Sequence, residues 1–326
     1  MASLAELLAE RGTLLIDGAM GTELFARGLT AGDPPEMWNL DHRDHVVDVH
    51  KGYIKAGSDI ILTNSFGGTS FRLKLHNLQD RVVELNRAAA EVGRDAADAS
   101  DRDIVVAGSM GPSGELLQPM GDMTPETAAA AFADQARGLT DGGADLLWIE
   151  TMSSLEEVEA AVAGARSVCD TPIAVTLSFD TAGHTMMGVS GVAAAERLGI
   201  LGLAALGANC GNNIAETEAA VLAIKQGAPT TPVISKANAG IPEFKGDKLH
   251  YTGTPEVMGA HLLRMKQAGI NIIGGCCGTA TQHIAYMRDV LDGATIPPDV
   301  SMPAPSPTNA EPRPERDTRR RRRRSQ

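Results

Sequence analysis

Short apolar runs alternate along the chain with longer amphipathic stretches, and each run ends in a glycine or polar loop. The apolar runs, rich in β-branched and aliphatic residues, predict strands at 13–17, 59–64, 104–110, 146–150, 172–179, 203–210, 232–238 and 270–276. The amphipathic stretches predict helices at about 44–56, 79–99, 125–142, 155–168, 193–198, 214–226, 255–268 and 281–291. Strands that are apolar throughout are typical of a parallel sheet covered on both faces.

Eight strand–helix units in succession predict an α/β fold of the (β/α)₈ TIM-barrel type. A doubly wound open sheet is the alternative, but no residues remain for a second domain. From about Pro297 the chain becomes proline-rich and then arginine-rich, with six arginines at 319–324. The sequence therefore predicts a barrel at 1–296 and a disordered tail at 297–326, which is either a solvated tail or a weak contact for an acidic partner.

Composition narrows the possible environments. The chain has 326 residues, of which 43% are hydrophobic, and a net charge of −12, which argues against a nucleic-acid-binding body. No apolar run has the length of a membrane span, and no signal peptide is visible. Four cysteines in a chain of this length do not make a disulfide scaffold. We expect a cytoplasmic protein with free or metal-bound thiols, no membrane contact and an oligomeric state that the sequence leaves open.

Three of the four cysteines follow predicted strands: Cys210 ends one run, and Cys276 and Cys277 end the last one. Barrel enzymes carry their chemistry at the carboxyl ends of the strands, so these thiols are expected on one rim. Three thiolates would hold a zinc ion with its fourth position open, as in a catalytic site. Ordinary buried cysteines are the alternative, because no CxxC or HxxxH spacing is present. Cys169 lies elsewhere and is expected to be a small buried hydrophobe.

Two acids also follow predicted strands. Asp17 ends the first run and Glu150 the fourth, and either carboxylate could bind the ammonium group of an amino acid. The alternative is that each acid binds loop amides nearby. Three histidines are further possible metal ligands, but none ends a predicted strand and we expect each at the surface: His184, His250 and His283.

Four motifs occur in order along the chain: DGAMGTEL at 17–24, TNSFG at 63–67, GANC at 207–210 and GGCCGT at 274–279. They resemble the homocysteine S-methyltransferase family, which includes betaine–homocysteine methyltransferase and the homocysteine module of cobalamin-dependent methionine synthase. The resemblance extends from about residue 11 to about residue 293 and does not cover the tail.

The resemblance implies a (β/α)₈ barrel that forms methionine by methyl transfer to a zinc-bound homocysteine thiolate. Zinc removes the proton of the substrate thiol, which then attacks an electrophilic methyl group. Asn238, in the segment SKANAG, is a candidate for the fourth zinc position when substrate is absent. The other implied site residues are the zinc ligands Cys210, Cys276 and Cys277 and the homocysteine-binding residues Asp17, Gly18 and Glu150.

The methyl donor is left open between two classes. One is betaine or another small onium compound; the other is methylcobalamin carried by a separate corrinoid protein, since the Asp-x-His-x-x-Gly motif of a cobalamin domain is absent. A quaternary ammonium donor calls for an aromatic cage. Animal betaine enzymes have tyrosines at places that look like Gly67 and Thr151 here, so only Trp38, Phe66 and Phe71 remain as candidate pocket aromatics.

Two other functions stay open at this point. The protein could be a non-catalytic zinc-binding scaffold or regulatory barrel, with the tail as a partner-binding segment. It could also methylate another thiol or selenol. The two acids and the open three-thiolate site favour homocysteine over both.

Overall fold

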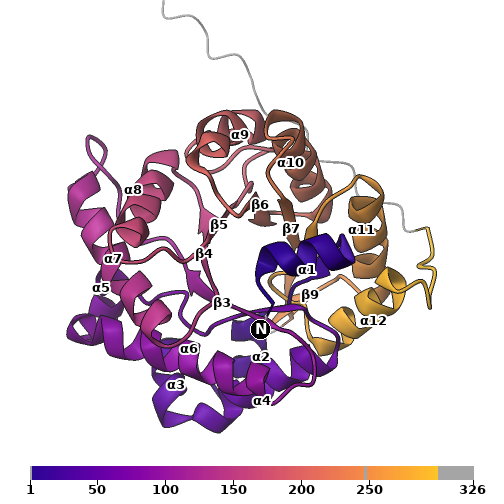
Figure 1. Cartoon of the computed structure of the whole chain (residues 1–326), viewed down its shortest axis with the longest axis horizontal. Coiled ribbons are helices and arrows are strands. Elements are labelled where there is room, and N and C mark those ends of the chain that lie inside the picture. The colour runs from indigo at the N-terminus through magenta and orange to yellow at the C-terminus, as the bar shows by residue number, and fades with distance from the viewer. Residues whose placement is uncertain (1, 246–247, 300–326) are drawn as a thin grey trace, which may run out of the picture.

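Eight parallel strands form a nearly closed barrel in a computed structural model that describes residues 2–245 and 248–299 (Figure 1). Around the barrel the strands follow the order β1-β10-β7-β6-β5-β4-β3-β2. Their bounds are β1 Leu14–Leu15, β2 Ile60–Leu62, β3 Val105–Met110, β4 Leu146–Met152, β5 Ile173–Leu177, β6 Ala205–Cys210, β7 Val233–Ala237 and β10 Ile272–Gly275. The predicted TIM barrel is confirmed, and the open doubly wound sheet is wrong. The predicted tail from residue 300 onward, with its arginine run, lies outside the described residues.

Eight long helices surround the barrel where the amphipathic stretches predict them. They are α4 Arg43–Lys55, α6 Val82–Asp98, α7 Pro125–Asp141, α8 Leu155–Arg166, α9 Gly191–Leu198, α10 Ile214–Gly227, α11 Pro255–Gln267 and α12 Thr281–Leu291. Side-chain caps determine where several of these helices begin. Backbone amides of the first turn donate to the side chains of Thr124, Ser154, Ser190 and Asn213. In the described part of the chain, no helix is both long and apolar enough to cross a membrane.

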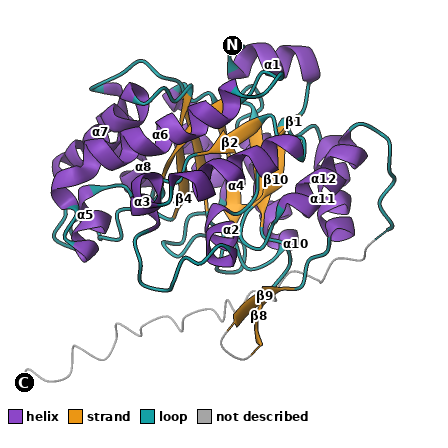
Figure 2. Ribbon diagram, turned by 90° about the horizontal axis from the view of Figure 1, so that it is seen from below, coloured by secondary structure: helices purple, strands orange, loops and turns teal. Residues whose placement is uncertain are grey.

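Several elements were not predicted, because they are short or lie outside the repeating units. They are α1 Leu4–Arg11, α2 Met20–Ala26, α3 Trp38–Asp41, α5 Ser70–Leu73, the 3₁₀ helices η1 Pro35–Met37, η2 Lys74–His76 and η4 Gly199–Leu201, and a hairpin of β8 Pro242–Lys245 and β9 Lys248–Tyr251. The 3₁₀ helix η3 Gln79–Arg81 forms the start of the stretch predicted as a helix at 79–99. Figure 2 shows α1 and the hairpin at opposite ends of the barrel. The amino-terminal end of the barrel is thus covered by a helix.

Both faces of each strand are buried, as the continuous apolar runs require. Leu14 and Ile16 belong to the cluster inside the barrel, which also contains Leu7 of α1, whereas Leu15 packs into the cluster beneath the helices. Trp148 is the largest fully buried side chain, and its Nε1 donates to Thr176 Oγ1 at 3.3 Å. Packed side chains therefore fill the amino-terminal half of the barrel, so that open space is left at the carboxyl ends of the strands.

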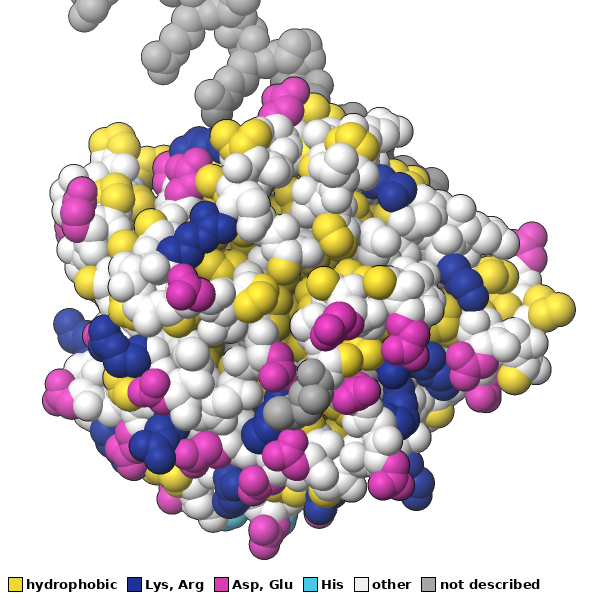
Figure 3. Space-filling model, viewed as in Figure 1, with side chains coloured by type: hydrophobic (Ala, Val, Ile, Leu, Met, Phe, Trp, Pro, Cys, Tyr) yellow, Lys and Arg dark blue, Asp and Glu magenta, His cyan; other side chains and the backbone are white. Residues whose placement is uncertain are grey.

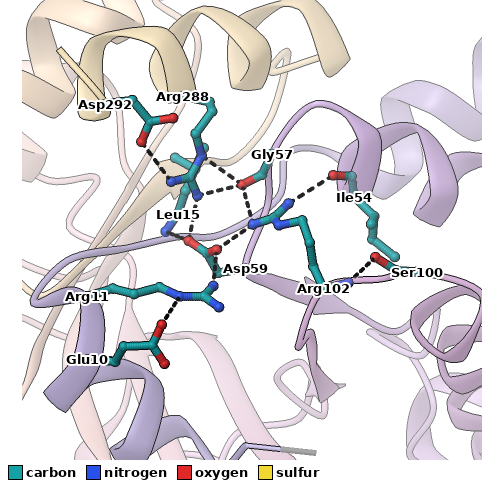
Figure 4. Close-up of polar contacts among 10 residues, drawn as sticks. All are labelled: Glu10, Arg11, Leu15, Ile54, Gly57, Asp59, Ser100, Arg102, Arg288 and Asp292. Atoms are coloured by element: carbon teal, nitrogen blue, oxygen red, sulfur yellow. Dashed lines mark hydrogen bonds and ion pairs between the residues drawn. The ribbon is translucent and has the colours of Figure 1, made fainter. Parts of the chain in front are cut away.

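The barrel closes between β1 and β2, where a single parallel bridge joins Ile16 and Ile60. Asp59, 1% exposed, reinforces this seam: its Oδ2 accepts the Leu15 amide at 2.9 Å. Three guanidinium groups surround the same carboxylate, those of Arg11 at 2.7 Å, Arg102 at 2.6 Å and Arg288 at 2.6 Å (Figure 4). We call these four side chains the Asp59 cluster. Since they link α1, α12 and the strand ends, the cluster holds the amino-terminal end together.

The surface at this end carries no single sign of charge. In the view of Figure 3, onto the face covered by α1, acidic and basic side chains are interspersed. Such a mixture offers little attraction to a highly charged partner. The opposite end of the barrel, at the carboxyl ends of the strands, is where barrel enzymes carry their active sites.

Candidate active site at the carboxyl ends of the strands

Three thiols converge at this rim. Cys210 is the last residue of β6, and Cys276 and Cys277 directly follow β10; both backbones meet Ala237 of β7, which pairs with Cys210 and accepts the Cys276 amide at 2.7 Å. The Sγ atoms of Cys210 and Cys276 are 2.8 Å apart, and all three Sγ atoms lie within 4.8 Å of one another. Among the described residues this is the one group with the composition and spacing of a metal site.

The loops that carry the thiols are held in unusual backbone conformations. Cys210 has φ 57°, in the left-handed region that non-glycine residues rarely adopt, and Gly211 follows with φ 79°. Asn238 links the two loops: its Nδ2 donates to Gly211 O at 2.8 Å, and its Oδ1 accepts the Cys277 amide at 3.0 Å. Asn238 therefore positions both cysteine loops in the described conformation. Its role as a zinc ligand stays a prediction.

Because the three thiols lie so close together, each one shifts the pKa of its neighbours. Hydrogen bonds from Cys210 and Cys276 lower the pKa of Cys277 to about 3. Hydrogen bonds to Cys276 and Cys277, together with burial, raise the pKa of Cys210 well above its usual range. A metal cation bound in place of the thiol protons would stabilise three neighbouring thiolates, and sulfur ligands suit zinc.

Both predicted acids are buried at the same end. Asp17 is 1% exposed; its Oδ2 accepts the Leu62 amide at 2.7 Å across the β1–β2 seam, while its Oδ1 has no hydrogen-bond partner. Glu150, in β4, accepts a hydrogen bond from the Ser109 hydroxyl. Burial raises the pKa of Asp17 to about 7 against the opposing effect of Lys236, and burial also raises the pKa of Glu150. Both carboxylates can therefore accept further hydrogen bonds from a cationic group.

Lys236 is the residue that the sequence reasoning missed. It lies in β7, 3% exposed, with Nζ 3.5 Å from Asp17 Oδ1 and 3.4 Å from Gly18 O. Burial alone would lower its pKa, but Asp17, Cys276 and Glu150 together raise it. A lysine inside the apolar run 232–238 was the available signal, since a buried charge needs a partner.

Gly18 sits where no other residue fits. A Cβ atom on Gly18 would lie 2.2 Å from Thr279 O, and the next amide, that of Ala19, donates to the same oxygen at 2.9 Å. The first-strand loop therefore packs directly on the loop that follows Cys277.

A cavity of about 470 Å³ joins these groups. Its wall includes the three cysteines, Gly18, Ser109, Glu150 and Lys236. Asp17 does not line the cavity, but it contacts Lys236, which does. The structure thus brings the predicted cysteines, Gly18 and Glu150 to one cavity and places Asp17 one side chain deeper.

Other candidate residues have different roles. Among the candidate aromatics, Phe66 lines the cavity, Trp38 is buried against the rings of His42 and His45, and Phe71 packs beside Leu117.

Outside the three-thiol site, Cys169 packs against the main core, but it is half-buried and not fully buried as expected. His184 is exposed, as predicted, and the side chain of His250 lies outside the described part of the chain. The expectation of a surface position is wrong for His283, which is 6% exposed. Its Nδ1 accepts the Ala280 amide at 3.0 Å and its Nε2 lies 3.2 Å from Gly253 O, so it caps α12.

Comparison with known proteins agrees with this geometry. A sequence model of the family described as homocysteine S-methyltransferase matches residues 14–291. The chain belongs to the homocysteine S-methyltransferase family. Methionine synthase of Mycobacterium tuberculosis is 31% identical over 296 residues, which cover 86% of this chain and 25% of that protein. Methionine synthase of Mycobacterium leprae is also 31% identical, with 24% of its length covered, so the chain spans about a quarter of these relatives.

A solved structure of similar length carries the name of a homocysteine methyltransferase. The metallated form of the homocysteine methyltransferase MmuM from Escherichia coli matches with a TM-score of 0.74 and 26% identity. The match covers 86% of this chain and 97% of that one. Family membership thus extends over the whole barrel, including every strand end that contributes to the cavity.

Proposed function

We propose that this protein is a zinc-dependent methyltransferase that converts homocysteine to methionine. The observation that carries the proposal is the convergence of three Sγ atoms, within 4.8 Å of one another, on a cavity that also exposes Glu150 and Lys236. Three soft ligands leave one position of a tetrahedral ion for a substrate sulfur. Free thiols in the described residues further support a reducing, cytoplasmic location.

Cys210, Cys276 and Cys277 would hold the zinc ion. When bound, zinc supplies the positive charge that keeps the substrate thiol deprotonated, so the protein needs no general base of its own. The groups around it bind the amino-acid end of homocysteine: Glu150 faces the ammonium group, and Lys236, held by Asp17, faces the carboxylate. In the transfer, a bond forms between sulfur and the methyl carbon while the donor's bond to that carbon breaks, and its electron pair stays with the leaving group. Much of the rate then comes from alignment of the two substrates.

A small onium donor is our first candidate, because a further buried carboxylate, that of Glu36, lines the cavity. Betaine is one such compound, although Phe66 is the one candidate aromatic on the wall and does not make a cage by itself. Methylcobalamin on a separate corrinoid protein is the second candidate, and similarity to part of methionine synthase favours it. A non-catalytic zinc barrel or a methyltransferase for another thiol is less well supported, since neither accounts for the buried Asp17–Lys236 pair beside the thiols.

The test compares two cysteine variants. Cys276→Ala should lose stoichiometric zinc and reduce methionine formation at least about a thousandfold, since several kcal/mol of charge stabilisation are removed. Cys169→Ala, a cysteine outside the site, is the matched control and should keep both. Metal analysis and a methionine assay on each protein check this. Full activity in a zinc-free Cys276→Ala protein would refute the proposal.

A further inference from the structure

Asn209 is a buried polar side chain that lies between the two halves of the site. It belongs to β6, one residue before Cys210, is 1% exposed and pairs in register with Lys236 of β7. Its Oδ1 accepts the Thr151 amide at 2.9 Å, and its Nδ2 donates to Thr151 Oγ1 at 2.7 Å. The same Nδ2 lies 3.7 Å from Cys276 Sγ, so Asn209 also donates to a thiol of the three-thiol site.

The orientation of the Asn209 amide follows from its partners. A backbone N–H can only donate, so the atom that faces the Thr151 amide has to be the oxygen. The nitrogen then faces the Thr151 hydroxyl and the Cys276 sulfur, both of which can accept a hydrogen bond. Both polar atoms of this buried side chain are therefore paired, and together they connect the end of β4 to the residue that follows β10.

Thr151 lies at an irregularity of β4. The register with β5 shifts between Ile149 and Met152, so β4 has one residue more than β5 over this stretch. Thr151 has φ 62°, in the left-handed region that a β-branched residue rarely adopts. A bulge redirects the side chains of its strand, and here the neighbours Glu150 and Thr151 both line the cavity. The two bonds from Asn209 hold this backbone and thereby set the position of the Glu150 carboxylate.

The contact to Cys276 concerns the other half of the site. Nδ2 of Asn209 is an uncharged donor, and it reaches the sulfur from β6, the strand that ends in Cys210. A group that hydrogen-bonds to a metal ligand orients that ligand, and its loss commonly lowers metal affinity by about 10- to 100-fold. The side chain that holds the bulge of β4 therefore also orients a candidate zinc ligand.

We propose that Asn209 is a positioning residue that joins recognition of the substrate's ammonium group to the metal site. This inference rests on the proposed function. Through Thr151 the residue fixes Glu150, which faces the ammonium group of homocysteine, and through Cys276 it orients one of the three thiols. Asn209 itself does not line the cavity, so it acts through these partners. The preference for a thiol that also carries an ammonium group thus depends on a side chain that the substrate does not touch.

The experiment compares two thiols that differ in one group, homocysteine and 4-mercaptobutyrate, which lacks the amino group. Calorimetric titration of the zinc-loaded full-length protein gives both affinities without a methyl donor. The unaltered protein should bind homocysteine at least about tenfold more tightly, the value of a charge-assisted hydrogen bond. Asn209→Ala should remove most of this preference, and competition with a chelator should show about tenfold weaker zinc binding.

A glycine at position 151 separates the two roles, because glycine adopts the left-handed backbone without support from a neighbour. The double variant Asn209→Ala/Thr151→Gly should therefore regain most of the preference for homocysteine, while its zinc binding should stay about tenfold weaker. A glycine there could not compensate for a side chain that only fills space.

Asn212→Ala is the matched control, because Asn212 is an exposed asparagine in the loop after β6 that does not line the cavity. It should change neither the preference nor zinc binding. Thermal melting checks that Asn209→Ala is folded. If it is not, Thr151→Val tests the same contact from the other side: the hydroxyl is lost, and the preference should fall about threefold with unchanged zinc binding. An unchanged preference in the folded variant, a double variant no better than Asn209→Ala, or unchanged zinc binding in Asn209→Ala would overturn the inference.

Failure of the inference differs from failure of the function. A zinc protein that prefers homocysteine equally with and without the Asn209 side chain would reject the positioning role and retain the function. A protein that binds no zinc, or a zinc-loaded protein that binds neither thiol, would reject both.

Discussion

The barrel has a buried aspartate at each end of the seam between β1 and β2, and the two differ in how completely they are paired. Each accepts an amide of the opposite strand, Leu15 for Asp59 and Leu62 for Asp17. Asp59 is surrounded by three guanidinium groups. Asp17 has one ammonium at 3.5 Å and an oxygen with no hydrogen-bond partner. A buried charge with complete partners stabilises the fold, whereas one with unused capacity is a candidate for function.

The largest effect is expected at the fully paired end. Asp59→Asn would leave three arginines without their shared anion and should lower the free energy of unfolding by about 3 kcal/mol, the low end for a buried pair because the guanidiniums are partly solvated. Methyl transfer per folded molecule should be unchanged. Urea denaturation checks the first outcome, with Asp101→Asn, an exposed aspartate, as control. A stable but inactive Asp59→Asn protein would contradict the purely structural role assigned to Asp59.

Asp17→Asn should show the reverse pattern. It removes the counter-ion of Lys236 at the cavity, so we expect kcat/KM for homocysteine to fall about 100-fold, as for loss of one partner of a buried charged pair. Stability should change less than in Asp59→Asn, because burial of the Asp17 carboxylate is itself unfavourable and Lys236 keeps the attraction of Glu150 and Cys276. Steady-state kinetics and denaturation on the same preparation test this. Equal losses of stability in the two variants would show that both aspartates are structural.

The pH dependence sharpens the contrast further. Burial raises the pKa of Asp17 from 3.8 to about 7, so the folded state favours its protonated form. Acidification from pH 7 toward pH 3.8 should therefore stabilise the fold through this group, by up to about 1.4 kcal/mol per unit, and the gain levels off below the unfolded value of 3.8. Over the same range kcat/KM for homocysteine should fall about tenfold per unit, the slope of one protonation. Asp17→Asn should lack this inflection. An inflection that persists in the variant would assign the titration to another group.

The smallest effect concerns a single member of the Asp59 cluster. Arg11→Gln leaves two guanidiniums on the carboxylate, and the Arg11 side chain is 27% exposed, so the loss should be about 1 kcal/mol or less. Denaturation measures it, and activity should not change. A loss as large as that of Asp59→Asn would mean that Arg11 alone carries the cluster.

The sequence predicted the barrel and the convergence of the three cysteines for the same physical reason. Parallel strands bring their carboxyl ends to one rim, so Cys210, Cys276 and Cys277 follow from strand positions alone. Partners across the barrel could not be predicted in this way. Lys236 meets Asp17 through the relative positions of two strands far apart in sequence, and His283 is buried because it contacts Gly253 beside the hairpin.

Glu36, on the wall of the cavity, was beyond prediction for a different reason. Glu36 lies in an irregular segment with neither a helical nor a strand period, and its burial depends on the missing side chain of Gly67. Phe66 was a candidate from the sequence, but Trp38 and Phe71 were equal candidates until packing separated them. Residues at the carboxyl ends of the strands were thus predictable as rim residues, whereas Glu36 in its irregular segment was not.

Zinc K-edge absorption of the purified protein, with and without homocysteine, tests the central claim most directly. The account predicts three sulfur neighbours at about 2.3 Å in the protein alone and a fourth after homocysteine is added. Zinc held mainly by nitrogen or oxygen, or a sulfur count that homocysteine does not change, would contradict it.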